Sequence, residues 1–512
     1  MARRLTRHLL ALVALALPAA AVAQADLTPA IRAYNQGQFD RAALHLYNFI
    51  ASSGQGGDRA RAEFYLAQTL EKLKFFESAK YHYGQIVNAG PSHPYYIPAI
   101  EGLIQIAEVV DDDVIVPALL NREYNEDFQR LRPEFLHKAN YLVGLVAQRA
   151  GNLDEAEAFL LTVPEDSSYF ARARYLLGVV QIQKGQHAGT PDAMDQASEA
   201  ALAYFNQVLQ LSDPNYVDLR DLRDLALLGM ARTYYGLGEY ALAVEYYEQV
   251  PRFSRFWDEA LFENGWARFM NEDYGGALGT LQALHAPQFA GAFQPESWTL
   301  KATVYYTACL YDEAKKALDA YAANYSQYVR MMQPVLAADR EASYYYGLIA
   351  KEEERKKLPR AVYNYLAANR RVAGFNRYVA QLDSELAGIA GHPTFRGTPL
   401  RDELIQVVQQ QKNLLENVAG SFIKNRLANA IDMVSHFDAQ SEIIRFETSK
   451  AETERIESGV DVEAHLARQK HYRPRIPAED WEYWNFQGEY WIDEIGYYQF
   501  TLKTGCVQRE EE

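Results

Sequence analysis

Apolar and polar positions follow a helical period through most of the chain, and one hairpin pattern returns several times. Each copy has a small turn, an aromatic residue or Leu, two further positions and then an Ala. The copies end at Ala42, Ala79, Ala156, Ala243, Ala277 and Ala314. The step from Ala243 to Ala277 is 34 residues, and the steps from Ala42 to Ala79 and from Ala277 to Ala314 are 37. A recurrence of this length predicts stacked helical hairpins.

The residues around each copy support the same interpretation. A small residue precedes the turn in the first helix, at Ala67, Gly144, Gly178, Ala231, Gly265 and Ala302. A bulky residue follows the Ala by four positions, at Leu46, Tyr83, Leu160, Tyr247, Leu281 and Leu318. Antiparallel helices approach closely only where side chains are small, and a large residue one turn later fills the groove beside the contact. We therefore expect an all-α fold.

The best copy runs from Leu225 to Pro251, and it carries Ala231, Tyr235, Gly238, Tyr240, Ala243, Tyr247 and Pro251 in the places that tetratricopeptide repeats use. On these residues the chain resembles tetratricopeptide-repeat proteins. The resemblance covers residues 26–325. It implies an α-solenoid that works by binding other proteins.

Some tetratricopeptide domains grip a partner's carboxylate with Lys and Asn on successive first helices. The matching positions here hold Phe64 and Gln68, Tyr141 and Leu145, Tyr175 and Val179, Leu228 and Arg232, and Phe262 and Trp266. That clamp is absent. We expect an aromatic, apolar groove with occasional Arg, suited to an amphipathic helix or an extended apolar peptide, with Phe64, Tyr141, Tyr175, Arg232, Phe262 and Trp266 as partner-binding residues.

Two stretches depart from the repeat. An insertion near residues 187–199 precedes a second helix that resumes at Ala201, and the pattern is eroded between Pro98 and Pro133, around the acidic run 111–113. Each is either a partner-binding elaboration or, as we favour, a surface loop and a degenerate unit.

The C-terminal third loses the period. Residues 326–400 predict further helices, and residues 401–474 predict long helices with a roughly coiled-coil spacing at Leu404, Val407, Leu414, Val418, Phe422, Leu427, Ile431, Val434 and Phe437. This spacing fits three arrangements of the long helices: a helical hairpin, a helix packed on the end of the solenoid, and pairing between two molecules. The oligomeric state therefore stays open.

Residues 475–512 form an aromatic tail with Trp481, Trp484 and Trp491, and with strand-like character around residues 497–502. Such aromatic density either caps the solenoid or forms a docking surface, and a cap is the more general need of a terminal repeat.

The N-terminus carries Arg3, Arg4 and Arg7, then an apolar run and small residues, which is the order of a cleavable secretory signal. We expect residues 1–25 to be removed, a periplasmic location and no later membrane span. The chain has 51 Lys and Arg against 67 Asp and Glu, so nucleic acid is not an expected partner. Cys309 and Cys506 are too few for a disulfide framework, and we expect two independent thiols, although they could pair in an oxidising compartment.

No motif for nucleotide binding, serine hydrolysis or zinc proteolysis occurs, and the eleven His are scattered. We expect no enzyme activity, cofactor or metal. The leading function is a periplasmic scaffold or adaptor that binds other envelope proteins or peptides; the signal, repeat array and Trp-rich tail resemble tetratricopeptide components of myxobacterial-type gliding-motility and envelope machinery. The alternatives are a chaperone-like or regulatory accessory of outer-membrane assembly or cell-wall remodelling, and an enzyme within residues 326–512.

Overall fold

The computed structural model describes residues 26–53, 56–112, 114–289, 292–459, 461–469, 484 and 489–506. The predicted signal at residues 1–25 and Trp481 lie outside these ranges. The regular elements of the described part are helices, and the stretch 497–502, predicted to be strand-like, forms no strand there. No helix in these ranges combines the length and apolarity that a bilayer crossing needs.

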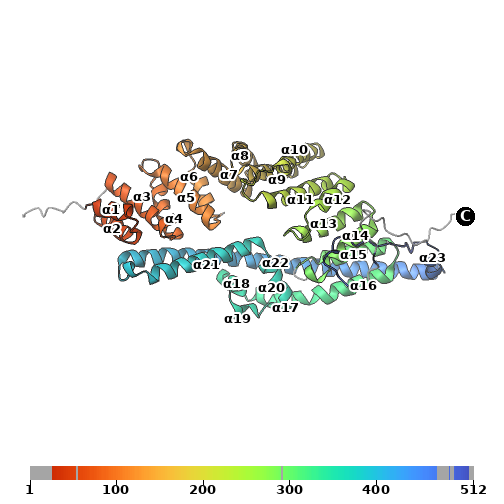
Figure 1. The fold of residues 1–512 in the computed structure, drawn as a ribbon. Coiled ribbons are helices and arrows are strands. Elements are labelled where there is room, and N and C mark those ends of the chain that lie inside the picture. Colours follow the sequence, from red (N-terminus) through yellow and green to blue (C-terminus); the bar gives the residue numbers. More distant parts are fainter. Residues whose placement is uncertain are drawn as a thin grey trace, which may run out of the picture.

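An all-α, tetratricopeptide-like solenoid makes up the first part of the chain. Consecutive helices pair from α1/α2 to α15/α16, rising across Figure 1 and descending again toward α16. The helices are α1 (Thr28–Asn35), α2 (Phe39–Ser52), α3 (Gly57–Lys72), α4 (Phe76–Asn88), α5 (Tyr96–Val110), α6 (Ile115–Glu123), α7 (Pro133–Arg149), α8 (Leu153–Leu161), α9 (Phe170–Ala188), α10 (Pro191–Gln210), α11 (Leu219–Gly236), α12 (Tyr240–Gln249), α13 (Trp257–Met270), α14 (Tyr274–Leu284), α15 (Glu296–Thr307) and α16 (Tyr311–Tyr321), with 3-10 turns η1 (Glu126–Arg130) and η2 (Pro287–Phe289).

The small and bulky positions of the repeat meet as predicted. All six Ala that define the pattern are fully buried. A methyl group added at Gly144 would lie 2.8 Å from Leu160 Cγ, and one at Gly265 would lie 3.2 Å from Leu281 Cδ2. Hairpin packing therefore depends on glycine or alanine facing a large side chain.

The insertion near residues 187–199 is helical, so the favoured surface-loop interpretation was wrong. Helix α9 continues to Ala188, and α10 starts at Pro191 behind Thr190, whose hydroxyl accepts from the Ala193 amide at 3.4 Å. Pro at the first helical position and Thr before it form a helix start that the sequence already contained. The insertion lengthens a hairpin whose Ala201 and Phe205 keep the repeat spacing.

The C-terminal helices turn back along the solenoid. They are the π-helical turn η3 (Ala322–Ser326), α17 (Gln327–Ala337), α18 (Ala342–Ala350), α19 (Glu352–Arg355), α20 (Arg360–Ala367), α21 (Arg370–Gly391), the turn η4 (Pro393–Phe395), α22 (Pro399–Glu457) and α23 (Val462–Arg468). The 59-residue α22 contacts α4 near one end and α15 and α16 near the other, and it runs beneath the array of hairpins in Figure 1.

Helix α22 packs within its own chain, mainly on α18 and α21. The predicted stripe is buried at Leu404, Leu427, Ile431, Val434 and Phe437. Between Leu404 and Leu427 the register differs from the predicted one, because Leu415 and Ala419 are buried while Leu414 and Val418 are 53% and 39% exposed. The helix meets different neighbours along its length, so no single heptad frame applies. At Gly420 the carbonyl of Ala342 lies where a Cβ would stand.

Candidate functional site

The first helices of the solenoid carry a row of charged and aromatic side chains, which we call the first-helix face; it comprises Tyr141, Tyr175, Arg232, Phe262 and Trp266. Arg232 on α11 reaches α13, where its guanidinium contacts Glu259 at 2.6 Å and both carboxylate oxygens of Glu263 at 2.8 Å. The Arg232 side chain is 42% exposed. Of this cluster, only Arg232 was predicted from the sequence. The two carboxylates that pair with it, those of Glu259 and Glu263, were not predicted.

The other members of this face are half-buried. The Trp266 indole donates to Glu296 on α15 at 3.0 Å. Burial raises the pKa of the Tyr175 phenol, and Arg232 opposes that shift. The Arg172 guanidinium lies 6.0 Å from the Tyr141 ring centre. The face is therefore amphipathic, with rings beside charges, and less apolar than predicted.

Two of the predicted partner-binding residues contribute to packing. Phe64 is 9% exposed and stacks on Tyr95, with ring centres 4.7 Å apart, so it offers little surface to a partner. Phe262 packs against the core around Trp257 and Tyr247. The structure thus separates Phe64 from the first-helix face.

The described part of the C-terminal tail crosses the solenoid. Ile495 is fully buried in the core of α12 and α13, and the Phe500 amide donates to the Gly275 carbonyl at 3.3 Å. A Cβ at Gly275 or Gly279 would collide with the tail carbonyls of Phe500 and Tyr498. Two glycines one turn apart on α14 therefore admit the tail backbone, so this segment covers the solenoid.

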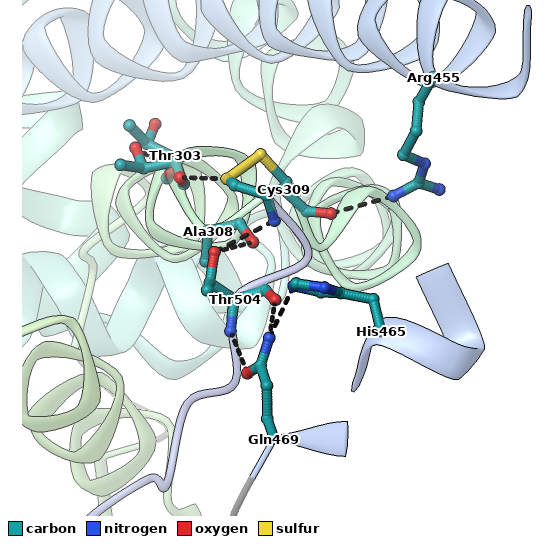
Figure 2. Close-up of a disulfide and its surroundings, with 9 residues drawn as sticks. Thr303, Ala308, Cys309, Arg455, His465, Gln469 and Thr504 are labelled. Atoms are coloured by element: carbon teal, nitrogen blue, oxygen red, sulfur yellow. Dashed lines mark hydrogen bonds between the residues drawn. A yellow bond between two sulfur atoms is a disulfide. The ribbon is translucent and has the colours of Figure 1, made fainter. Parts of the chain in front are cut away.

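A disulfide fixes the end of the tail, which corrects the expectation of two independent thiols. Cys309 and Cys506 are bonded, with Cα atoms 5.0 Å apart. Figure 2 shows the surroundings: Arg455 donates to the Cys309 carbonyl at 3.1 Å, and Gln469 accepts from the Thr504 amide at 3.0 Å. Helix α22, α23 and the tail meet at the corner between α15 and α16. A separation of 197 residues hides this pairing from sequence patterns.

The remaining predicted tail residues are solvent-exposed. Trp484 is 69% exposed and Trp491 is 58% exposed, although Trp491 neighbours the buried Ile495. The tail thus has a packed side and an exposed aromatic side. Trp481 lies outside the described residues.

A buried polar cluster joins α4 to α21. Lys80 contacts Glu77 at 2.9 Å and Asp112 at 3.1 Å, and the Tyr378 hydroxyl donates to Glu77 at 2.7 Å. Burial disfavours the charge of Lys80, but the two carboxylates more than offset it and hold the pKa of the ammonium well above its usual range. Asp112, in the acidic run, is therefore a structural anion.

Glu385 on α21 caps α4 from outside. Its carboxylate accepts from the amides of Glu77 and Ser78, each at 2.9 Å, and from the Ser78 hydroxyl at 2.7 Å. Helix α4 starts behind Phe75, which cannot cap it. Other helices, such as α5 and α16, also start without a side-chain cap, so the sequence alone did not locate this carboxylate.

A buried Ser–His contact lies between α14 and α15. His285 Nε2 is 2.9 Å from Ser297 Oγ, and the hydroxyl also donates to the Gln294 carbonyl at 2.6 Å. Ser297 is 1% exposed, so a substrate has no access to it. Burial lowers the pKa of nearby Lys301 to about 8.

Within the described ranges, no group of three or more His, Cys, Asp or Glu is arranged to hold a metal ion.

A cavity of about 920 Å³ opens among α18, α19, α21 and α22. Its lining balances Arg340, Lys351, Arg355 and Lys412 against Glu341, Glu354, Asp383 and Glu416. Lys412 is already paired with Asp383 across the opening. Because basic and acidic residues are equal in number, the lining favours neither an anionic nor a cationic ligand.

Comparisons with known proteins leave the family open. No protein-family model matches the chain, and no curated protein matches it. Among solved structures, the "Crystal structure of APC/C hetero-tetramer Cut9-Hcn1" matches with a TM-score of 0.22 and 12% identity, covering 82% of this chain and 95% of that chain. A TM-score of this size supports no inference about function.

Proposed function

We propose that the protein is a non-enzymatic scaffold that holds together components of a periplasmic cell-envelope complex. The observation that carries this proposal is the first-helix face, where Tyr175 lies beside the Arg232 cluster and Tyr141 and Trp266 are half-buried near other charges. Helical-hairpin arrays use such extended faces to bind segments of other proteins. The resemblance in sequence points to gliding-motility machinery as one setting.

The proposed compartment rests on two independent features. The N-terminal residues have the order of a secretory signal. A disulfide between Cys309 and Cys506 persists in oxidising compartments and is rare in reducing ones. Cell fractionation with thiol labelling tests this: we expect a periplasmic protein that starts near Asp26 and carries no free thiol. A cytosolic protein with two labelled cysteines would contradict it.

The scaffold role is tested by crosslinking in cells followed by mass spectrometry. We expect crosslinks from envelope proteins to α9, α11 and α13, and their loss in a Tyr175→Ala/Trp266→Ala variant. Tyr204→Ala, on the second helix α10, is the matched control. Crosslinks to outer-membrane assembly factors would favour the accessory role. Hydrolysis of peptidoglycan by the purified protein would overturn the scaffold.

A further inference from the structure

Exposed apolar side chains of the tail lie beside one loop of the solenoid, and Arg252 connects the two. We call these side chains the aromatic tail patch: Phe253 from the loop between α12 and α13, with Trp491, Ile492 and Tyr497 from the tail. These side chains are 51%, 58%, 65% and 45% exposed. Isolated exposed apolar residues are ordinary, whereas four adjacent ones mark an interaction surface.

Arg252 holds the two parts of the patch together. Its guanidinium lies 4.4 Å from the Tyr497 ring centre and 5.2 Å from that of Phe253. It also donates to the carbonyls of Ile492 at 2.9 Å and Asp493 at 3.0 Å. With Ile495 buried beneath and the disulfide downstream, the patch is built on fixed backbone.

Phe253 lies on unusual backbone, and its ring packs edge-on against the buried Trp257, with ring centres 4.8 Å apart. The φ of Phe253 is +61°, in the left-handed region that bulky residues avoid. The loop between α8 and α9 has the same turn, since the Ser167 amide bonds the Pro164 carbonyl there as the Ser254 amide bonds that of Pro251 here. At the matching position that loop has Asp166, whose φ is not positive. The turn thus keeps an aromatic ring half exposed at the edge of the solenoid, and strained backbone of this kind clusters at binding surfaces.

Carboxylates surround the patch and set the charge of its partner. Asp493 and Glu494 form no ion pair within the part of the chain that the structure describes. Burial raises the pKa of Glu494, and the neighbouring Asp493 and Glu489 raise it further. Arg252, the cation on this surface, is already occupied by carbonyls and rings. Among the residues that the structure describes, this negative charge has no ion-pair partner, and it favours a partner that carries cations.

We propose that the aromatic tail patch binds a basic, apolar segment of another protein, whose apolar side chains cover Trp491, Ile492 and Phe253 while its Lys or Arg residues pair with Asp493 and Glu494. This inference rests on the proposed scaffold function and names the partner's chemistry. The same carboxylates repel anionic lipid, which excludes a membrane surface as the occupant.

A labelled amphipathic peptide with Leu and Lys at helical spacing is the first probe, with the full-length oxidised protein. We expect Trp491→Ala, Phe253→Gly and Asp493→Asn/Glu494→Gln each to weaken binding about tenfold. The double variant also reduces the salt dependence. Glu352→Gln/Glu353→Gln removes two exposed charges on α19 and leaves binding unchanged. Phe253→Gly relieves the backbone but removes the ring contact with Trp257, so its thermal unfolding is measured beside binding; weaker binding with unchanged unfolding shows that the ring itself binds the peptide.

The proposal is overturned if the wild type does not bind the Leu and Lys peptide, or if all variants bind it as tightly as the wild type does. It is also overturned if the wild type binds a peptide of Leu and Glu equally well. A photo-crosslinking residue at Ile492 or at Trp266, in cells that naturally make the protein, separates the two proposals. A crosslinked segment rich in Lys or Arg at 492 supports the patch, and a lipid adduct or an acidic segment there overturns it. Crosslinks from position 266 but not from position 492 would overturn the proposal for the aromatic tail patch and leave the scaffold proposal standing. If neither position gave a crosslink, both proposals would be overturned.

Discussion

At the scale of single residues, small side chains decide where two parts of this molecule touch. In the repeats, Gly144 and Gly265 receive Leu160 and Leu281 from the second helix of the same hairpin. On α14, Gly275 and Gly279 receive the backbone of the tail instead. Small residues therefore allow close contact both between the two helices of a hairpin and between α14 and the tail that covers it.

Gly279→Ala places a methyl group against the Tyr498 carbonyl, so we expect the tail to lift. Overpacking of this kind lowers the free energy of unfolding by about 1–3 kcal/mol. Denaturant titration measures the loss, and hydrogen exchange of residues 489–506 locates it. Gly84→Ala in α4 is the control: its methyl group meets nothing within 4 Å and adds roughly 0.5–1 kcal/mol of stability. Unchanged tail exchange in Gly279→Ala would contradict this contact.

His82 makes folding sensitive to acid. Burial lowers the pKa of its imidazole to about 4, and Nε2 has no hydrogen-bond partner. The ring stays neutral in the folded chain while the unfolded chain binds a proton below about pH 6.5, so stability present above that pH is lost as the pH falls toward 4. Relative to His82→Leu, we expect the wild type to lose roughly 1–2 kcal/mol between pH 7 and pH 5.

Thermal or denaturant unfolding at several pH values measures this difference. His187→Gln, which changes an exposed ring, should keep the wild-type pH profile. Parallel profiles for wild type and His82→Leu would exclude the imidazole as the cause.

The sequence predicted residues that pair within a hairpin and missed those that pair across the molecule. The Gly144 and Leu160 pairing recurs at a fixed spacing, so one chain contains several examples of it. Glu385 and Ser78 meet once, 307 positions apart, and no spacing rule covers such a contact. For the first-helix face, the family positions located Arg232, but its partners Glu259 and Glu263 belong to the next unit.

At the scale of elements, α21 attaches to the solenoid through polar contacts in addition to apolar packing, in which the Phe75 ring lies against Gly388. Glu385 caps α4, Tyr378 joins the Lys80 cluster, and Arg377 pairs with Asp111 at 2.9 Å. A helix terminus without its own cap needs partners from elsewhere. The pairing of α4 with α21 is thus specified by hydrogen bonds.

Glu385→Ala leaves the amides of Glu77 and Ser78 buried without acceptors. We expect the free energy of unfolding to fall by about 1–3 kcal/mol. Exchange of the amides at the start of α4 should rise most. Glu385→Gln keeps one acceptor oxygen and should restore part of the loss, while Ser384→Ala, on the exposed side of α21, is the control. An effect confined to α21 would argue against capping.

The long helix α22 illustrates how far helical periodicity extends. The absence of Pro after Pro399 and the spacing of Leu404, Leu427 and Val434 predicted a long helix correctly. Its partners were not predictable, because α4, α15 and α18 approach it from different directions and bury different faces. A changing environment produces an irregular stripe, which resembles an imperfect coiled coil in the sequence.

At the scale of the whole molecule, the C-terminal segments link the two ends of the solenoid. Helix α22 contacts α4 and, farther along, α15 and α16, while the tail returns over α14 to Cys309. In Figure 1 the hairpins arch over α22, and the two meet near both ends of the arch. An isolated solenoid contacts only neighbouring units, whereas this one has long-range ties that couple distant hairpins.

Cys506→Ser tests the last of these ties. A disulfide restricts the unfolded chain, and its removal typically costs 2–5 kcal/mol in small secreted domains. Here the tail is also held by Gly275, Gly279 and Ile495, so we expect a loss of about 2–4 kcal/mol with the tail partly released. Hydrogen exchange of residues 489–506 should rise while that of α2 to α8 stays the same.

Cys309→Ser and mild reduction of the wild type should reproduce this result, because each removes the same bond. The released tail would carry Trp491 and Ile492 away from Phe253, so binding of the basic peptide should weaken in parallel with the rise in exchange. If exchange rose without a change in binding, the tail alone would suffice for recognition and Phe253 would have no part in it. Parallel loss of both makes the disulfide the element that presents the aromatic tail patch, and it connects the redox state of the compartment to partner binding.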